Sequence, residues 1–192
     1  MSPSFKHNCT NDHYVVEWAS KQAAKADYIV THYGDRFDIK FLQSRLLYHG
    51  LDPLPLPKCL DTWKMSRSTL KLHSNRLASI AAFIGAGNKT PLSGPIWIRA
   101  MSGHVPSINY VVKHCEQDVL VLEAVYNKLR RLDGCHPNVQ VFYGKPDGCP
   151  RCGSEHLESK GYRATQLYVY QKFFCKACKS YVRSTKQTLM GP

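Results

Sequence analysis

The stretch ADYIVTHYGDRFDIKFLQSRLLYHG, residues 26–50, decides the fold expected for the longer part of this chain. Its opening β-branched run, residues 26–32, predicts a short strand, and Gly34 predicts the turn that follows. Apolar residues then recur at helical spacing from Phe37 to Leu47, and His49-Gly50 is typical of a helix end. A strand that leads through a tight turn into an amphipathic helix favours an α/β fold.

The neighbouring segments extend this pattern in both directions. Apolar spacing predicts a helix over 14–26, and the proline-rich residues 52–57 predict a loop. A second short strand is expected over 58–63. A helix over 77–84 is expected next, with Ser74-Asn75 as its cap and Gly85 at its end.

The remaining part of the first domain contains the longest predicted helix. Residues 88–106 read as irregular, whereas apolar residues over 107–132 recur at steps of three and four and predict a helix that packs lengthwise on the sheet. Glycine and proline over 144–148 indicate a linker. We therefore expect one domain over 1–143, and a linker with a small second domain over 144–192.

The charge of the chain favours a polyanionic partner. The 192 residues contain 26 Lys and Arg against 14 Asp and Glu, a formal net charge of +12. The excess is densest after residue 148, where eight basic residues accompany two acidic ones. Such an excess binds phosphates and releases counterions, so DNA or RNA is the expected partner.

No feature of the sequence indicates a membrane or secretory route. The chain has no run of about 18 apolar residues, and its first residues lack the apolar core of a signal peptide. We therefore expect a cytoplasmic protein. In a reducing compartment regularly spaced cysteines more often bind metal than form disulfides.

Four of the eight cysteines are spaced as metal ligands. Cys149-Pro-Arg-Cys152 and Cys175-Lys-Ala-Cys178 are two Cys-x-x-Cys knuckles, and a strand-like run over 167–174 lies between them. Two knuckles complete the tetrahedral shell that Zn²⁺ prefers, which predicts a structural zinc ribbon at the C-terminus. Two disulfides and a redox-active pair are the alternatives.

The predicted ribbon interleaves basic and aromatic side chains, a mixture suited to phosphate contact and base stacking on single strands. A solvated basic face and a protein-docking ribbon remain the alternatives. The residues predicted to contact nucleic acid are Arg151, Lys160, Arg163, Tyr168, Tyr170, Lys172, Phe173, Lys176, Lys179 and Arg183.

Two aspartates of the first domain stand out by their position. Asp38 opens the helix that follows the first strand, where its carboxylate lies at the sheet edge. Asp118 follows His114 by four residues, so the two side chains share one helical face. For each residue taken alone, a helix-terminal charge or a surface pair is the competing interpretation.

The order of these motifs resembles ribonuclease H-like exonucleases of the DnaQ type, especially the YprB-related subgroup. HYGDRFD at 32–38 is similar to the family's second motif, with Tyr33 in place of the usual Asn, and HCEQDVLVLEAVY at 114–126 is similar to the third, with His114 in place of Tyr. The subgroup often continues into His-Pro-Asn, found here at 136–138, a linker and a four-cysteine ribbon. The resemblance implies a ribonuclease H-like mixed sheet with flanking helices.

The resemblance also implies two-metal 3′-to-5′ exonuclease chemistry. Asp38 and Asp118 match two of the four carboxylates that would hold Mg²⁺ or Mn²⁺, and His114 matches the residue that orients or deprotonates the attacking water. The family's first motif, Asp-x-Glu, does not occur in the sequence. Asp61 is the nearest substitute, although a structural hydrogen-bonding role is the favoured interpretation for it.

The absent motif leads to two hypotheses. One is a truncated or N-terminally divergent nuclease that hydrolyses poorly unless a longer chain restores the first strand. The other is a catalytically inactive adaptor that keeps the nuclease shape and binds nucleic acid or a protein partner. Retention of Asp38, His114 and Asp118 favours the nuclease.

Overall fold

The computed structural model describes residues 11–54, 58–87, 91–138, 140, 147–184 and 188–189. The chain divides into two compact units, Met1–Leu129 and Arg130–Pro192, and each is described by itself. The boundary predicted between residues 143 and 144 lies outside the described residues and stays a prediction.

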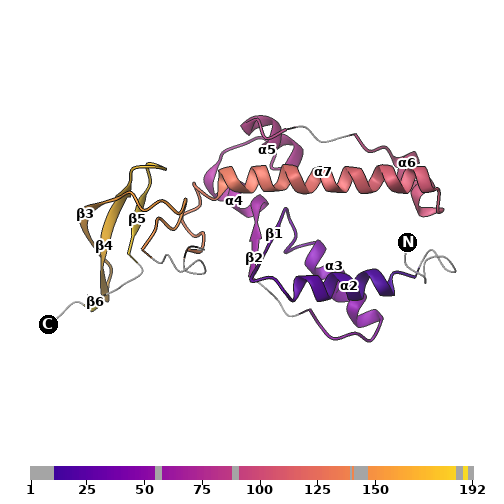
Figure 1. The fold of residues 1–192 in the computed structure, drawn as a ribbon, viewed down its shortest axis with the longest axis horizontal. Helices are drawn as coiled ribbons and strands as arrows, with labels where there is room; N and C mark the ends of the chain where they lie inside the picture. Colours follow the sequence, from indigo (N-terminus) through magenta and orange to yellow (C-terminus); the bar gives the residue numbers. More distant parts are fainter. Residues whose placement is uncertain are drawn as a thin grey trace. The chain divides into compact units, whose positions relative to one another are not determined.

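A parallel pair of strands forms the sheet of the first unit. β1 (Tyr28–Thr31) pairs with β2 (Lys58–Asp61), and the register sets Thr31 opposite Asp61. The chain crosses between them through α3 (Asp38–Tyr48), and α2 (His13–Ala23) lies beside α3 (Figure 1). Both strands therefore end at the same edge of the sheet, which is where polar sites of α/β folds gather.

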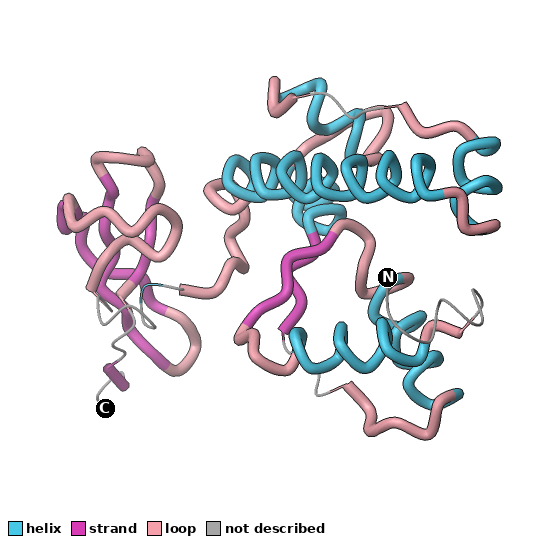
Figure 2. Tube along the Cα trace, turned by 45° about the vertical axis from the view of Figure 1, so that its right-hand side comes forward, coloured by secondary structure: helices cyan, strands magenta, loops and turns pink. Residues whose placement is uncertain are grey.

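The described part of the first unit contains four more helices. They are α4 (Thr62–Thr69), α5 (Leu77–Ile84), α6 (Gly94–Met101) and α7 (Val105–Leu129). Figure 2 shows α7 as the longest helical stretch of the fold. No described helix combines the length and the apolar character needed to cross a membrane.

Three sequence-based expectations about these helices are wrong. The second strand ends at Asp61, and Trp63 lies in α4, because the Asp61 carboxylate accepts the Trp63 N–H and caps a helix there. The cap of α5 is Arg76 rather than Ser74-Asn75. Residues 94–101 are helical, since Pro95 in a first turn needs no N–H partner.

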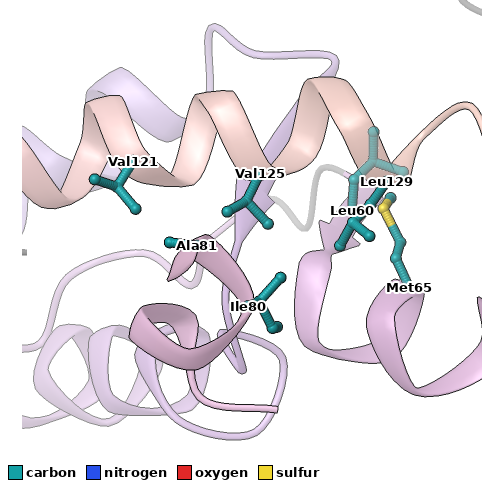
Figure 3. Packing of buried hydrophobic residues seen from close by; sticks show 7 residues of the cluster. All are labelled: Leu60, Met65, Ile80, Ala81, Val121, Val125 and Leu129. Carbon is teal, nitrogen blue, oxygen red and sulfur yellow. The ribbon is translucent and has the colours of Figure 1, made fainter. Parts of the chain in front are cut away.

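The core of the first unit lies along the C-terminal half of α7. Val121, Val125 and Leu129 share one helical face and pack against side chains from β2, α4 and α5, as Figure 3 shows: Leu60, Met65, Ile80 and Ala81. Full burial of one such large aliphatic side chain is worth about 1.5–3 kcal/mol. Instead of lying lengthwise on the sheet as expected, α7 thus packs largely against helices, and its N-terminal part contacts α6.

A smaller core and a polar clamp join α2 to α3. Val16, Leu46 and Leu54 are buried together. Beside them Arg45 donates to both carboxylate oxygens of Asp12, at 2.7 and 2.5 Å, and His49 Nε2 lies 2.7 Å from Asp12 Oδ1. The Arg45 hydrogen bonds, opposed by burial and assisted by His49, hold the pKa of Asp12 well below its usual range.

The second unit is built on an antiparallel sheet. β4 (Tyr168–Cys175) pairs with β3 (Leu157–Ala164) on one side, and with β5 (Tyr181–Arg183) and β6 (Thr188–Leu189) on the other. The buried hydrophobic cluster in its described part consists of Cys149, Cys175 and Val182. Helices on a small parallel sheet, with a sheet-based cysteine unit at the C-terminus, give the mixed α/β class that was predicted.

Candidate functional site

The four knuckle cysteines form one cluster. The sulfurs of Cys149 and Cys178 lie 3.8 Å apart, and those of Cys152 and Cys175 lie 3.6 Å apart. All four sulfurs fall within 4.8 Å of one another, and all four thiols are free. Zn–S bonds of about 2.3 Å in a tetrahedron place sulfurs about 3.8 Å apart. The donor set and its spacing therefore fit a zinc ion, whereas a disulfide needs sulfurs about 2.05 Å apart.

The two knuckles are built alike. Gly153 N–H donates to Cys149 O at 2.7 Å, and Lys179 N–H donates to Cys175 O at 2.9 Å. Gly153 and Lys179 each stand four residues after the first cysteine of their knuckle, and both have a left-handed backbone, with φ of 79° and 58°. Repetition of this turn aims both pairs of sulfurs at one point.

The thiols of the cluster are electrostatically unequal. Burial raises the pKa of Cys149 to about 12. At Cys178 burial also acts to raise the pKa, but hydrogen bonds from Ser180 and the neighbouring thiols outweigh it and lower the value to about 7. A divalent cation at the centre would favour the thiolate form of all four, so metal binding and proton release are coupled here.

Half of the ten predicted nucleic-acid residues gather on the outer face of this sheet. Alternation along β4 puts Tyr168, Tyr170 and Lys172 on one face. The cross-strand partners of Tyr170 and Lys172 are Arg163 and Arg183, and opposite residues share a face. We call these five residues, with Tyr181, the outer face of the ribbon. Phe173 points the other way and packs against the cysteine cluster, so the structure separates it from this set.

The other predicted binding residues lie elsewhere. Lys160 pairs with Glu158 at 2.6 Å, and Lys176 lies 3.9 Å from the same carboxylate. Lys179 belongs to the second knuckle turn, as described above. Arg151, in the first knuckle, donates to Arg131 O at 3.0 Å and to Ser180 Oγ at 3.3 Å. Sequence reasoning alone does not separate these residues from the outer face.

In the first unit, α7 brings His114 and Asp118 together as predicted from their spacing. His114 Nε2 lies 3.5 Å from Asp118 Oδ2, and the side chains are 13% and 28% exposed. They continue the helical stripe of Val121 and Val125, so they lie at the edge of the core. Asp38 is the exposed first residue of α3. Within the described part of the chain these three residues do not form a metal-sized group, unlike the cysteines.

A polar cluster lies at the sheet edge where β1 and β2 end, and the sequence predicted a hydrogen-bonding role there for Asp61 alone. Asp61 is 4% exposed, and its Oδ1 accepts the N–H groups of Tyr33 and Trp63 at 2.8 and 2.9 Å. Thr62, which is fully buried, donates to Thr31 O at 2.8 Å and lies 2.9 Å from His32 Nδ1. Apart from the local bond between Trp63 and Asp61, these bonds join residues about 30 positions apart, which no local sequence signal reveals.

The same edge holds a thiol and a second carboxylate. Thr31 Oγ1 lies 3.1 Å from Cys59 Sγ, and burial, followed by a hydrogen bond to Asp35, raises the pKa of Cys59 to about 11. Asp35 is also paired with Lys64. Cys59 is therefore a neutral thiol at physiological pH, and the edge serves mainly to connect β1, β2 and α4.

Residues 2–130 match the family model of the RNase H superfamily. The chain belongs to the RNase H superfamily. Comparison with curated proteins and with solved structures gave no match.

The region that matches the RNase H superfamily contains the candidate catalytic residues of the first unit. The match includes Asp38, His114 and Asp118 and stops just after α7. Nucleases of this superfamily act on nucleic acid with divalent metals, which agrees with the positive charge of the chain. The chain is accordingly a nuclease-family protein whose C-terminal cysteines can hold a zinc ion.

Proposed function

We propose that this protein is a 3′-to-5′ exonuclease of the DnaQ-like, YprB-related type, which hydrolyses phosphodiester bonds in DNA or RNA. The superfamily match over residues 2–130 carries the proposal. The juxtaposition of His114 and Asp118 supports it, because a half-buried imidazole beside a carboxylate is suited to proton transfer.

The described residues complete only part of a two-ion site. Two divalent ions need about four carboxylates, whereas the family pattern maps onto Asp38 and Asp118 alone. Asp61 does not replace the missing pair, because it is a single carboxylate, is 4% exposed, and already accepts two backbone N–H groups at Oδ1. The described residues therefore do not fit a full pair of Mg²⁺ or Mn²⁺ ions.

His114 and Asp118 have separate roles in this proposal. Asp118 orients the imidazole from one helical turn away. The His114 imidazole positions a water and accepts its proton. A divalent ion held by Asp38 or Asp118 would activate that water and neutralise charge on the phosphate. With two carboxylates instead of four, we expect hydrolysis to be slow.

The test is hydrolysis of a 5′-labelled oligonucleotide with Mg²⁺ or Mn²⁺. Asp118→Asn should lower the rate by at least about 10²-fold, as loss of an oriented electrostatic group commonly does. Glu123→Gln is the matched control, since Glu123 is an exposed carboxylate on the same helix. Equal rates for Asp118→Asn and the unmodified chain would refute the proposal. A chain that stays inert at high concentration would instead support the adaptor hypothesis.

We further propose that the C-terminal unit is a structural zinc ribbon that binds single-stranded nucleic acid for the nuclease unit. The outer face supports this, because it combines cations with tyrosine rings on a zinc-supported sheet. Lys160, Lys176 and Lys179 add general positive charge outside that face, and Phe173 contributes to the core around the cysteines. Nucleic-acid affinity should fall as salt concentration rises.

A further inference from the structure

The second unit contains a cavity of about 810 Å³ beside the outer face of the ribbon. One wall is the sheet, which contributes Arg163, Tyr170, Lys172, Tyr181 and Arg183. The opposite wall is the segment 133–138, together with Pro150 and Arg151 of the first knuckle. This volume lies within the range of about 300–1,000 Å³ typical of sites for small ligands.

The cations of the sheet wall are held in place by aromatic rings. The Arg183 guanidinium carbon lies 4.4 Å from the centre of the Tyr170 ring, and Lys172 Nζ lies 4.3 Å from the centre of the Tyr181 ring. Cation–π contacts of this length hold the charged groups above the rings. Tyr181 is nevertheless 56% exposed, so part of its surface stays open to a ligand.

The opposite wall is fastened by Arg151. Its two hydrogen bonds, to Arg131 O and Ser180 Oγ, tie the segment before the ribbon to the second knuckle. A Cβ on Gly134 would lie 3.8 Å from Arg151 Nη2, so the loop passes close to this guanidinium. The zinc knuckle therefore positions one side of the cavity and the sheet positions the other.

The lining of the cavity carries a net positive charge and therefore favours an anionic ligand. Arg151, Arg163, Lys172 and Arg183 supply four positive charges, against one carboxylate, Asp133, among the described lining residues. Asp133 Oδ1 accepts the N–H of Cys135 at 2.9 Å and thus stabilises the loop turn. Such a lining suits a ligand that carries phosphate groups for the cations and a flat ring for the tyrosines.

We propose that this cavity is a subsite for one or two nucleotides of a single-stranded nucleic acid, with phosphates on the cations and a base against Tyr181. The inference rests on the proposed nucleic-acid function of the ribbon and narrows it to a defined set of residues. A duplex does not fit the site, because its base faces are stacked inside it and unavailable to a tyrosine ring.

The binding role of the cavity residues is tested by fluorescence anisotropy. The probes are labelled 12-nucleotide oligomers of deoxythymidine and of uridine, without added divalent cation. Arg183→Ala and Tyr181→Ala should each weaken binding about tenfold, as loss of one base stack or charged contact does. Lys25→Ala and Tyr162→Ala change exposed residues outside the cavity that have no proposed role in binding, and they should change Kd by less than about threefold. Tyr181→Phe should retain affinity, because it keeps the ring.

The zinc content of every variant checks that the ribbon is folded. Equal losses in cavity and control variants would show that general charge alone binds the strand and would overturn the proposal. Tighter binding of a duplex than of the single strands would overturn it as well.

Cys135 provides an independent readout, since it is exposed and lines the cavity. Bound oligonucleotide should slow alkylation of Cys135 at least about fivefold, the protection expected at roughly 80% occupancy of a site that shields the thiol. Cys115, exposed on α7, reports the nuclease unit separately. Protection of Cys115 without protection of Cys135 would contradict the cavity proposal.

These measurements separate failure of the subsite from failure of the nuclease proposal. If the chain does not hydrolyse nucleic acid but binding depends on Arg183 and Tyr181, the subsite stands and the catalytic proposal fails. If hydrolysis depends on Asp118 but cavity and control variants bind alike, the subsite fails and the nuclease proposal stands.

Discussion

The backbone N–H of Tyr33 donates to Asp61 Oδ1 at 2.8 Å and so joins the turn after β1 to the end of β2. Tyr33 has a left-handed backbone with φ of 68°, which costs a bulky residue about 1 kcal/mol or more. The same carboxylate oxygen caps α4 through the Trp63 N–H. One buried side chain thus holds the turn after β1 against the start of α4.

Asp61→Ala should therefore destabilise the first unit by about 2–3 kcal/mol, because two N–H groups lose a charged acceptor and a helix loses its cap. Asp61→Asn keeps an oxygen acceptor and should cost less. Urea unfolding followed by tryptophan fluorescence measures both changes, and the exposed Asp52→Ala is the control. A loss below about 0.5 kcal/mol for Asp61→Ala would show that this carboxylate is free for another role.

The clamp of Asp12, Arg45 and His49 predicts a loss of stability in acid. The pKa of Asp12 is lowered in the folded state, so its stabilising contribution is fully present above the unfolded pKa of about 4 and is lost as pH falls below that value. Between pH 6 and pH 3, Asp12→Asn should remove part of the acid destabilisation, whereas Asp52→Asn should leave it intact. Identical pH profiles for all three chains would contradict the clamp.

Zinc removal should unfold the C-terminal unit and spare the first one. All three tryptophans, at positions 18, 63 and 97, lie in the first unit, so their fluorescence reports that unit alone. A strong chelator should remove the chemical-shift dispersion of the NMR amide signals from residues 149–184. The urea midpoint of unfolding measured by tryptophan fluorescence should stay the same.

Elemental analysis should give one zinc per chain, which Cys178→Ser should reduce and the exposed Cys115→Ser should not. Less than half an equivalent of zinc after reducing preparation, or disulfides among the four knuckle cysteines, would refute the zinc site.

The sequence predicted features that depend on local pattern. The strand, turn and helix of residues 26–50 and the long helix α7 follow from apolar periodicity, and the cysteine cluster follows from knuckle spacing. α6 escaped prediction because Gly94-Pro95 reads as a helix breaker, although proline fits a first turn. Phe173 was grouped with surface residues because strand alternation decides its face only once the position of the cysteines is known.

Features that depend on contacts distant in sequence could not be predicted in this way. The bond from Tyr33 to Asp61 spans 28 residues, and the cavity beside the ribbon needs a loop that precedes the first knuckle. Neither leaves a periodic or spacing signal, since each results from how separate elements pack.

The central claim, that α7 carries the catalytic groups of a nuclease, is tested most directly by one time course. A 5′-labelled single-stranded oligonucleotide is incubated with Mn²⁺ and the chain, its Asp118→Asn variant or its Glu123→Gln variant. We predict slow shortening from the 3′ end by the unmodified chain and by Glu123→Gln, and a rate at least about 10²-fold lower for Asp118→Asn. Equal shortening by all three proteins, or none by any of them, would contradict the account.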